Sequence, residues 1–374
     1  MTANNPLGSS FTIPFTDTKA YNYTFLDGFV KDTTQLIHSG RYILGEEVNR
    51  LERELEGYFS KKYAIGVSSG TTALELAFRA LNLSPTDEII VPANAYIACI
   101  FGARASGATI VPVDCTNNGT LDLDAVESAI RPTTRAVLVV HLYGDSCDMV
   151  RLSNLCQSHS LALVEDCAQS FGSEYCGKKL GSYGTIACHS FYPTKNLGAL
   201  GDAGAIVTDS EDIATRCRKM RNLGSTRKYE HDIVGTNARM DTLQAMFLLR
   251  KLPHVNEVIQ AKQAIVKQLI EVVGDRHLRN QDGHVYHSYH LFVLRVRDRD
   301  RFCKSLASAG IETIIHYPIP YYKSEALRDT TATFPVTESL AESIVSIPLH
   351  ASFKNSEIEY IIETLRNEAL NGSL

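Results

Sequence analysis

The first 250 residues alternate short apolar segments with longer amphipathic ones. Short continuous apolar runs between turn residues predict buried strands, and apolar positions at helical spacing predict helices over Thr71–Leu81 and Leu121–Ile130. Strands that are apolar on both faces and separated by helices indicate an α/β fold with a large, mostly parallel sheet. The expected strands are Tyr63–Val67, Glu88–Val91, Thr109–Val113, Ala136–Val140, Leu161–Val164 and Ala205–Val207.

The pattern changes at about Asp241, where a long helical stretch begins that is interrupted at Pro253 and runs to about Val273. Shorter alternating elements follow it. We therefore predict an N-terminal arm and large domain over residues 1–250 and a smaller α+β domain over residues 251–374. The expected elements of the smaller domain are strands near Tyr289–Val296 and Ile311–Ile315 and helices near Arg299–Ala309, Thr337–Val345 and Asn355–Asn367.

Composition and charge exclude several classes of protein. The 374 residues carry a formal net charge of −5. Nucleic-acid-binding proteins usually carry an excess of basic residues, so this class is not favoured. No apolar run approaches the roughly 20 residues that span a bilayer. Met1–Ser10 lacks a basic head followed by an apolar core, so we expect no secretory signal. The nine cysteines are scattered without a CxxC pair, which favours reduced thiols over a disulfide framework. We expect a cytoplasmic protein with no nucleic-acid or membrane partner.

Three histidines, His284, His287 and His290, recur at a spacing that on a helix would bring metal ligands together. The segment that contains them, HVYHSYHLFVLRV, is rich in β-branched and aromatic residues and predicts a strand instead. On a strand His284 and His290 share one face and His287 lies on the other. We therefore expect no metal site.

The segments that follow the expected strands are candidates for chemistry, because ligands of open parallel sheets bind beyond the carboxyl ends of the strands. Ser68–Leu74, SSGTTAL, is a hydroxyl-rich turn that opens a helix, and its backbone N–H groups suit a phosphate. An ordinary N-cap explains the same residues. In Glu165–Ser170, a carboxylate can hold a cationic ring nitrogen, bind a metal or cap the next segment.

The most informative segment is His189–Gly204, HSFYPTKNLGALGDAG, in which Lys195 stands between Pro193 and three spaced glycines. Such spacing predicts a constrained loop. A lysine on a loop beside the strand ends is open to desolvation, which leaves its amine partly neutral, as Schiff-base chemistry requires. The alternative is an ordinary surface lysine. A phosphate cradle, an aromatic, an acid and a loop lysine in this chain order together indicate a site for pyridoxal phosphate (PLP).

The chain resembles the sugar-nucleotide aminotransferases of the DegT/DnrJ/EryC1/StrS family. The resemblance implies the aspartate-aminotransferase-like (type I) PLP fold and amination of a keto-sugar. It runs from YILGEEV (Tyr42–Val48) to SIPLH (Ser346–His350) and includes VPANAYIA (Val91–Ala98), VHLYG (Val140–Gly144) and VGTNARMDTLQA (Val234–Ala245).

The same resemblance assigns cofactor roles to residues of this chain. Lys195 would form the Schiff base with PLP, and Asp166 would pair with the pyridine nitrogen. Gln169 would lie by the ring hydroxyl and Tyr96 would stack on the ring.

For the phosphate, the resemblance implies backbone N–H groups of Gly70 and Thr71 and the hydroxyl of Ser190. Asn237 would reach the phosphate from the other subunit, which makes a homodimer with a shared active site necessary for activity. His316 and Tyr317, in HYPIP, would lie beside the sugar nucleotide. Arg239 would meet an acidic part of the substrate or form a structural ion pair.

Three segments, VPANAYIA, KNLGALGDAG and HYPIP, resemble the enzymes that aminate C3 of a nucleotide-linked 3-keto-6-deoxyhexose, with dTDP the expected nucleotide. Enzymes that act at C4 usually carry Glu-Gly-Gly after the lysine, where this chain has Gly201–Gly204, GDAG. Two departures bear on the sugar: His189 replaces a common Phe, and Phe171 stands where related chains often have His. Both are expected near the cofactor or sugar.

We thus expect a PLP-dependent transamination in which L-glutamate is the amino donor and a dTDP-3-keto-6-deoxyhexose becomes a dTDP-3-amino-3,6-dideoxyhexose. One alternative is a C4 aminotransferase acting on a UDP-, GDP- or dTDP-linked 4-keto sugar. Another is a Rossmann dehydrogenase, but the chain has no GxGxxG turn after an early strand. A third is a non-catalytic regulator with the PLP fold.

Overall fold

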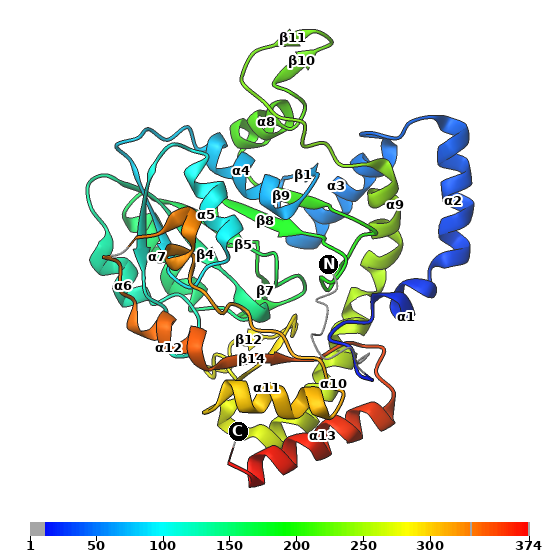
Figure 1. Cartoon of the computed structure of the whole chain (residues 1–374). Coiled ribbons are helices and arrows are strands. Elements are labelled where there is room, and N and C mark those ends of the chain that lie inside the picture. The colour runs from blue at the N-terminus through cyan, green and yellow to red at the C-terminus, as the bar shows by residue number, and fades with distance from the viewer. Residues whose placement is uncertain (1–11, 330, 373–374) are drawn as a thin grey trace.

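The computed structural model describes residues 12–329 and 331–372 of the chain. Its central feature is a seven-stranded sheet in the order β1-β9-β8-β5-β4-β2-β3 (Figure 1). Among these strands β9 alone runs antiparallel to its neighbours, so the predicted large, mostly parallel sheet is confirmed. The strands are β1 (Tyr63–Val67), β2 (Glu88–Pro92), β3 (Thr109–Val113), β4 (Thr134–Val140), β5 (Ala162–Asp166), β8 (Ile186–Ser190) and β9 (Gly204–Thr208).

Each expected strand of this sheet is present with bounds that differ by at most two residues, and one observed strand was not expected. The fifth strand ends at Asp166 rather than Val164, because its last residues Glu165 and Asp166 still pair with β4. The strand β8 was not expected, since IACHS is short and contains a histidine. It forms because β5 and β9 offer hydrogen-bonding edges on both of its sides.

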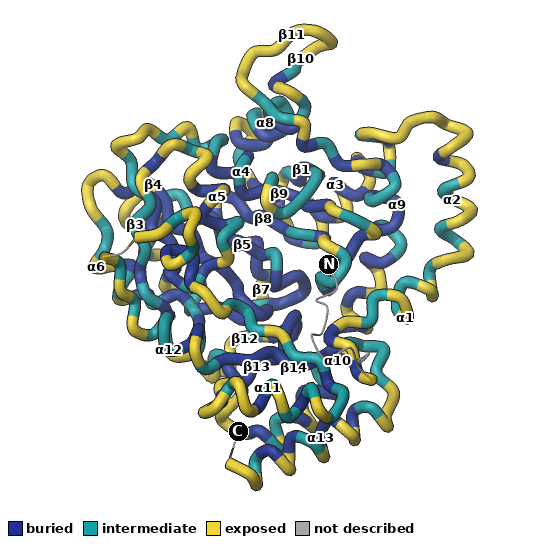
Figure 2. The backbone as a smooth tube through the Cα atoms, viewed as in Figure 1, coloured by how far each residue is buried: buried dark blue, intermediate teal, exposed yellow. Residues whose placement is uncertain are grey.

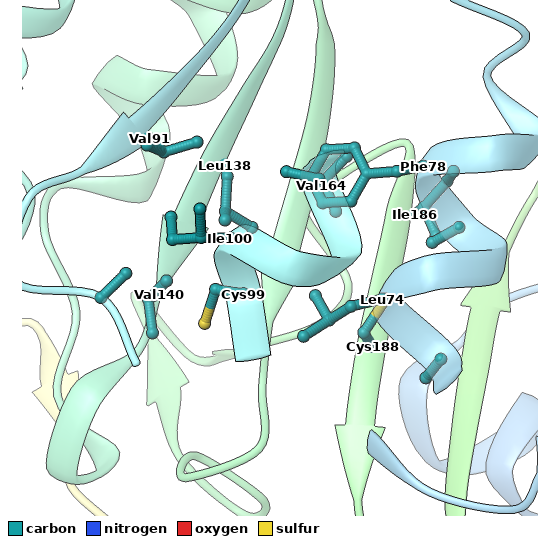
Figure 3. Packing of buried hydrophobic residues seen from close by; sticks show 14 of the residues in the cluster. Leu74, Phe78, Val91, Cys99, Ile100, Leu138, Val140, Val164, Ile186 and Cys188 are labelled. Carbon is teal, nitrogen blue, oxygen red and sulfur yellow. The ribbon is translucent and has the colours of Figure 1, made fainter. Parts of the chain in front are cut away.

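Helices cover the sheet and pack against it through apolar side chains. Figure 3 shows Leu74 and Phe78 of α4 and Ile100 of α5 against Val164 and Ile186 of the sheet. Burial of each such side chain contributes about 1.5–3 kcal/mol, so this layer fixes the first turns of α4 and α5 at the carboxyl edge of the strands. The helices of this part are α3 (Glu46–Phe59), α4 (Gly70–Ala80), α5 (Ile97–Arg104), α6 (Leu123–Ala129), α7 (Met149–Ser158), α8 (Glu211–Met220) and α9 (Thr242–Lys251).

The C-terminal part has a core cluster of its own, in which helices pack on a two-stranded antiparallel sheet. The long helical stretch is interrupted, as predicted, by a 3₁₀ turn over Leu252–His254. The division of the chain at residue 250 stays a prediction. The elements are α10 (Val255–Val273), β13 (Phe292–Arg295), α11 (Arg299–Ser308), α12 (Pro335–Ser343), β14 (Ile344–Ile347) and α13 (Asn355–Leu370).

Three expectations for this part were wrong. Ile311–Ile315 is no strand: it makes only single bridges, Ile13 to Ile311 and Ile314 to Ser346. The helix expected to reach Val345 ends at Ser343, because Val345 pairs with Leu294 in the sheet.

The third error concerns the histidine segment, which is not one strand. β12 (Val285–Tyr286) pairs with β6 (Glu174–Tyr175), itself paired with β7 (Lys178–Lys179), and residues 287–291 then lead to β13 in another sheet. His287 and His290 are both buried and His284 is exposed. The expectation that His284 and His290 share one face of a strand, with His287 on the other, is therefore wrong.

Two peripheral elements project from the body of the molecule. The hairpin of β10 (Ser225–Arg227) and β11 (Glu230–His231) extends beyond α8, and α1 (Thr18–Tyr23) leads into α2 (Leu26–Ser39), which packs on α9 (Figure 1). Both carry mostly exposed residues (Figure 2). All nine cysteines are free thiols. Among the described helices, none has both the length and the apolar character to cross a membrane.

Candidate active site

A cavity of about 1030 Å³ opens beyond the carboxyl ends of the parallel strands, between the large sheet and the C-terminal part. It is the place that the sequence predicted for the chemistry. Its lining includes most of the expected site residues, namely Gly70, Thr71, Tyr96, Asp166, Gln169, Ser190, Lys195, His316 and Tyr317.

One end of the cavity is formed by the first turn of α4, directly after β1. Ser69 caps the helix: its hydroxyl accepts from the N–H of Thr72 (3.1 Å), and the Thr72 hydroxyl accepts from the N–H of Ser69 (3.0 Å). The helix itself leaves the N–H groups of Gly70 and Thr71 without acceptors, and its dipole favours an anion there. The segment therefore caps the helix through Ser69 and Thr72 and still presents free N–H groups to an anion, so the two interpretations do not exclude each other.

Two glycines permit this turn to lie against the sheet. A Cβ on Gly70 would fall 2.6 Å from Cβ of Ser190, and one on Gly204 would fall 2.5 Å from the backbone of Ser69. The side chain of Ser190, the last residue of β8, is thereby held beside the N-terminus of α4. This cradle of two N–H groups and a hydroxyl suits a phosphate.

The acid of the site is Asp166, at the end of β5 and 4% exposed. Its Oδ1 accepts from the N–H of Ala168 (2.9 Å), and its Oδ2 accepts from the thiol of Cys99 (2.9 Å). The adjacent Glu165 does not line the cavity. It is fully buried and pairs with His141 (3.1 Å), whose contact holds the pKa of Glu165 below its usual range against the effect of burial.

Lys195 lies on the loop between β8 and β9, as the sequence predicted, and its backbone N–H donates to the carbonyl of Tyr192 (2.8 Å). Burial lowers its pKa from 10.5 to about 8, although the charge of Asp166 opposes this shift. The amine is still mostly protonated at neutral pH, but its neutral fraction is far larger than that of an ordinary lysine, which fits a nucleophilic lysine better than a surface lysine.

The remaining polar contacts connect two sides of the cavity. The Gln169 amide accepts from the backbone N–H of Tyr143 (2.6 Å) and donates to the hydroxyl of Tyr317 (3.0 Å). The ring of Tyr96, which precedes the first residue of α5, stacks on that of Tyr317 with centroids 4.9 Å apart. Tyr143 donates from its hydroxyl to the carbonyl of His316 (2.6 Å). These contacts join strand-end loops of the sheet to the HYPIP segment.

Several residues of the site were missed by sequence reasoning. Tyr143 orders Gln169, and its only signal was its place in VHLYG. Its φ of 65° is uncommon for a residue other than glycine. Lys251, Lys262 and His290 line the cavity too, but no local pattern marks them.

Two expected site residues lie away from the cavity of their own chain. Asn237 is exposed and its backbone bridges to Asn222. Arg239 is half-buried, with Nη1 donating to Oδ1 of Asn222 (3.2 Å). Neither lines the cavity.

The two departures from the family pattern also lie outside it. His189 and Phe171 are fully buried, and both pack on Phe59 in the core below the site. Their expected place near the cofactor or sugar is wrong, because the side chains of these residues point into the layer between the sheet and α3. They contact each other with ring centroids 6.0 Å apart.

The residues present fit pyridoxal phosphate. The cradle at α4 suits the phosphate, Asp166 suits a protonated ring nitrogen, and Lys195 offers an amine of lowered basicity. The buried acid and the lysine reach one cavity from separate strand ends of the same sheet.

Comparison with known proteins gives a consistent result. The profile of the DegT/DnrJ/EryC1/StrS aminotransferase family matches residues 27–366. A dTDP-3-amino-3,6-dideoxy-alpha-D-galactopyranose transaminase from Aneurinibacillus thermoaerophilus is 40% identical over 94% of this chain and 98% of its own. A dTDP-3-amino-3,4,6-trideoxy-alpha-D-glucose transaminase from Streptomyces venezuelae is 37% identical over 96% of both chains. The crystal structure of S. venezuelae DesV in complex with a ketimine intermediate superposes with a TM-score of 0.92, at 37% identity, over 96% of this chain and 99% of that one.

Proposed function

The chain belongs to the DegT/DnrJ/EryC1/StrS aminotransferase family, and on that premise we propose that it aminates C3 of a dTDP-linked 3-keto-6-deoxyhexose. It is a PLP-dependent transaminase, and L-glutamate is the proposed amino donor. The observation that carries the proposal is the convergence of a buried acid, an amine of lowered pKa and an anion cradle on one cavity. The transaminases from A. thermoaerophilus and S. venezuelae support the sugar and the C3 position.

Each site residue has a task in this proposal. PLP, when bound, supplies an electron sink for the negative charge that develops at the donor α-carbon. Gly70, Thr71 and Ser190 hold the phosphate, and Asp166 keeps the ring nitrogen protonated. The amine of Lys195, whose pKa is lowered to about 8, accepts and returns the proton at the reacting carbon as general base and acid.

Tyr96 lines the same cavity as Lys195 and would cover a face of the cofactor ring, and Gln169 would lie by the ring hydroxyl. His316 and Tyr317, of the HYPIP segment, line the cavity too and would contact the sugar nucleotide. Burial lowers the pKa of His316 to about 4, so its imidazole is neutral and serves as a hydrogen-bond partner rather than a cation.

A homodimer with a shared site is part of the proposal. Asn237 is exposed, and Val234, three residues before it in the sequence, exposes 82% of its surface, while Tyr229 in the turn of the β10–β11 hairpin exposes 84%. Exposed apolar side chains of this size in one segment of the chain are a candidate surface for a second copy. A second copy that covers this surface would bring Asn237 to the phosphate of its partner's site, where Arg239 would accompany it.

The direct test is the purified protein loaded with PLP and given glutamate and either dTDP-3-keto- or dTDP-4-keto-6-deoxyglucose. We expect the visible cofactor band to shift on addition of glutamate. We expect NMR of the product to place the amine on C3. An amine on C4 would replace the proposal with a C4 aminotransferase, and a bound cofactor that responds to no amino donor would favour a non-catalytic protein.

A further inference from the structure

A second buried lysine, Lys262, lines the cavity that contains Lys195. It lies in α10, and 6% of its surface is exposed. Its Nζ donates to Oδ1 of Asn196 (2.9 Å) and to the carbonyl of Tyr289 (3.3 Å). Because Asn196 follows Lys195 directly, this ammonium group lies beside the loop that presents the reactive amine.

A third lysine, Lys251, lines the cavity from the last turn of α9 and is 2% exposed. Its Nζ donates to the carbonyl of Gly198 (2.7 Å) and to Oδ1 of Asn22 (3.0 Å). The two lysines thus contact the same loop at positions two residues apart, Asn196 and Gly198. Each ammonium group has a further proton that these hydrogen bonds do not use. The Lys251 ammonium also lies over the rings of Tyr21 and Phe247, at 4.8 and 5.2 Å from their centroids, which offsets part of the cost of its burial.

Neither lysine has a carboxylate within ion-pair distance among residues 12–329 and 331–372. Lys61, which is buried outside the cavity, illustrates the usual solution with Asp209 at 2.9 Å. A buried ammonium group without a counter-charge is costly, and burial lowers the pKa of both lysines to about 8. At neutral pH both are still mostly protonated.

The carboxylates that line the cavity are engaged elsewhere or exposed. Asp166 accepts from Cys99 and Ala168, Glu312 accepts from the N–H of Phe15 (2.8 Å), and Asp17 caps α1. Asp202 is exposed. The two lysines are therefore cations without a protein counter-ion, in a cavity whose proposed substrates are all anions.

We propose that Lys251 and Lys262 form an anion-binding subsite beside Lys195 that receives an oxyanion of the substrate. The oxyanion is a carboxylate of the amino donor or the diphosphate of the sugar nucleotide. The inference rests on the proposed function, because that function places both groups in this cavity. It explains how a chain of net charge −5 binds them, because the cations are local and line the cavity itself.

The test measures binding to the PLP-loaded protein by calorimetry, with two unreactive probes. Glutarate reports the donor carboxylates and thymidine diphosphate reports the nucleotide. The informative variants are Lys262→Gln and Lys251→Gln, which retain hydrogen-bond donors for the loop but lose the charge. We expect the Kd of one probe to rise about ten- to hundredfold, the scale of a charge-assisted hydrogen bond. The probe that responds identifies the source of the oxyanion.

Controls separate this subsite from general effects. Lys61→Gln removes a buried ammonium group outside the cavity and should leave both Kd values at the wild-type level, whereas Lys262→Arg keeps the positive charge and should bind the responding probe more tightly than Lys262→Gln does. The subsite is overturned if the glutamine variants bind both probes with wild-type affinity. If only one of the two variants folds, its affinities decide. Failure of wild-type protein to aminate any keto-sugar overturns the proposed function instead, and the binding data still decide the subsite.

Discussion

The thiol of Cys99 donates a hydrogen bond to Oδ2 of Asp166, with Sγ and oxygen 2.9 Å apart. Figure 3 shows Cys99 in the first turn of α5, facing the sheet. The thiol is fully buried, and burial and the Asp166 charge raise its pKa well above 9.0, so it stays a neutral donor. It does not line the cavity and acts through the carboxylate.

Substitution Cys99→Ala should release one oxygen of Asp166 and weaken the hold on the cofactor ring. A lost hydrogen bond to a charged group costs about 1.5–3 kcal/mol, so the Kd for PLP should rise about tenfold or more. Cys99→Ser restores a donor and should recover most of this affinity. Equal PLP affinity in the alanine and serine variants, measured by titration of the apoprotein, would show that the contact does not matter.

Substitution Lys195→Ala should abolish the visible band that a cofactor–lysine Schiff base gives. Because it also removes the proposed general base and acid, turnover should fall by about 10²–10⁴-fold or more. Lys62→Ala, an exposed lysine far from the cavity, is the matched control and should behave as wild type. Normal turnover of a correctly folded Lys195→Ala protein would refute the assigned role.

The cradle at α4 makes a specific prediction for Gly70→Ala. The new Cβ would fall 2.6 Å from Cβ of Ser190, so the helix must move away from β8 at a cost of about 1–3 kcal/mol. Both the melting temperature and the PLP affinity should decrease. Gly57→Ala is the control, since Gly57 lies exposed in α3 with no atom near its Cβ position, and there alanine should stabilise by up to about 1 kcal/mol.

Loading of PLP onto the apoprotein should depend on pH through Lys195. Only the neutral amine attacks, and its pKa is lowered from 10.5 to about 8. The neutral fraction therefore increases with pH below 8 and saturates above it. The rate at which the visible band appears should rise about tenfold per pH unit up to that point and then level off. A free alkylamine measured in parallel should continue to rise, and a matching profile for the protein would show that Lys195 is not desolvated.

The shared site can be tested by mixing two inactive proteins. Consider a dimer of one Lys195→Ala chain and one Asn237→Ala chain. If each site takes its asparagine from the partner, one of the two sites in this dimer contains both Lys195 and Asn237 and is intact. Random reassortment should then restore about a quarter of the wild-type activity. If Asn237 serves its own chain, no hybrid contains an intact site and the mixture should stay inactive.

The sequence predicted what local patterns determine. The strand β1 and the turn Ser68–Leu74 could be found because an apolar run ends in small hydroxyl residues. Lys195 was found because proline and glycines flank it. The strand β8 could not be found in this way, since its residues are held by the edges of β5 and β9.

The cavity wall contributed by the C-terminal part was beyond local inference. Lys262 is one polar residue within an amphipathic helix, and His290 stands in a segment that resembled a strand. Their chemistry arises only when α10 and residues 287–291 fold over the loop after Lys195. His189 and Phe171 show the converse, because neighbours of site residues in sequence point into the core.

The single reversed strand of the sheet has a consequence for how this chain tolerates change. Because β9 runs against β8, Ser190 and Gly204 face each other across the ladder, and the segment that carries Lys195 leaves and re-enters the sheet at one point. Connections between parallel strands run over a helix and can lengthen at the surface, but this one is anchored at both ends beside the cavity. Insertions in residues 191–203 should therefore displace the reactive amine. We expect natural and engineered length variation to be confined to the other connections, in particular those between parallel strands.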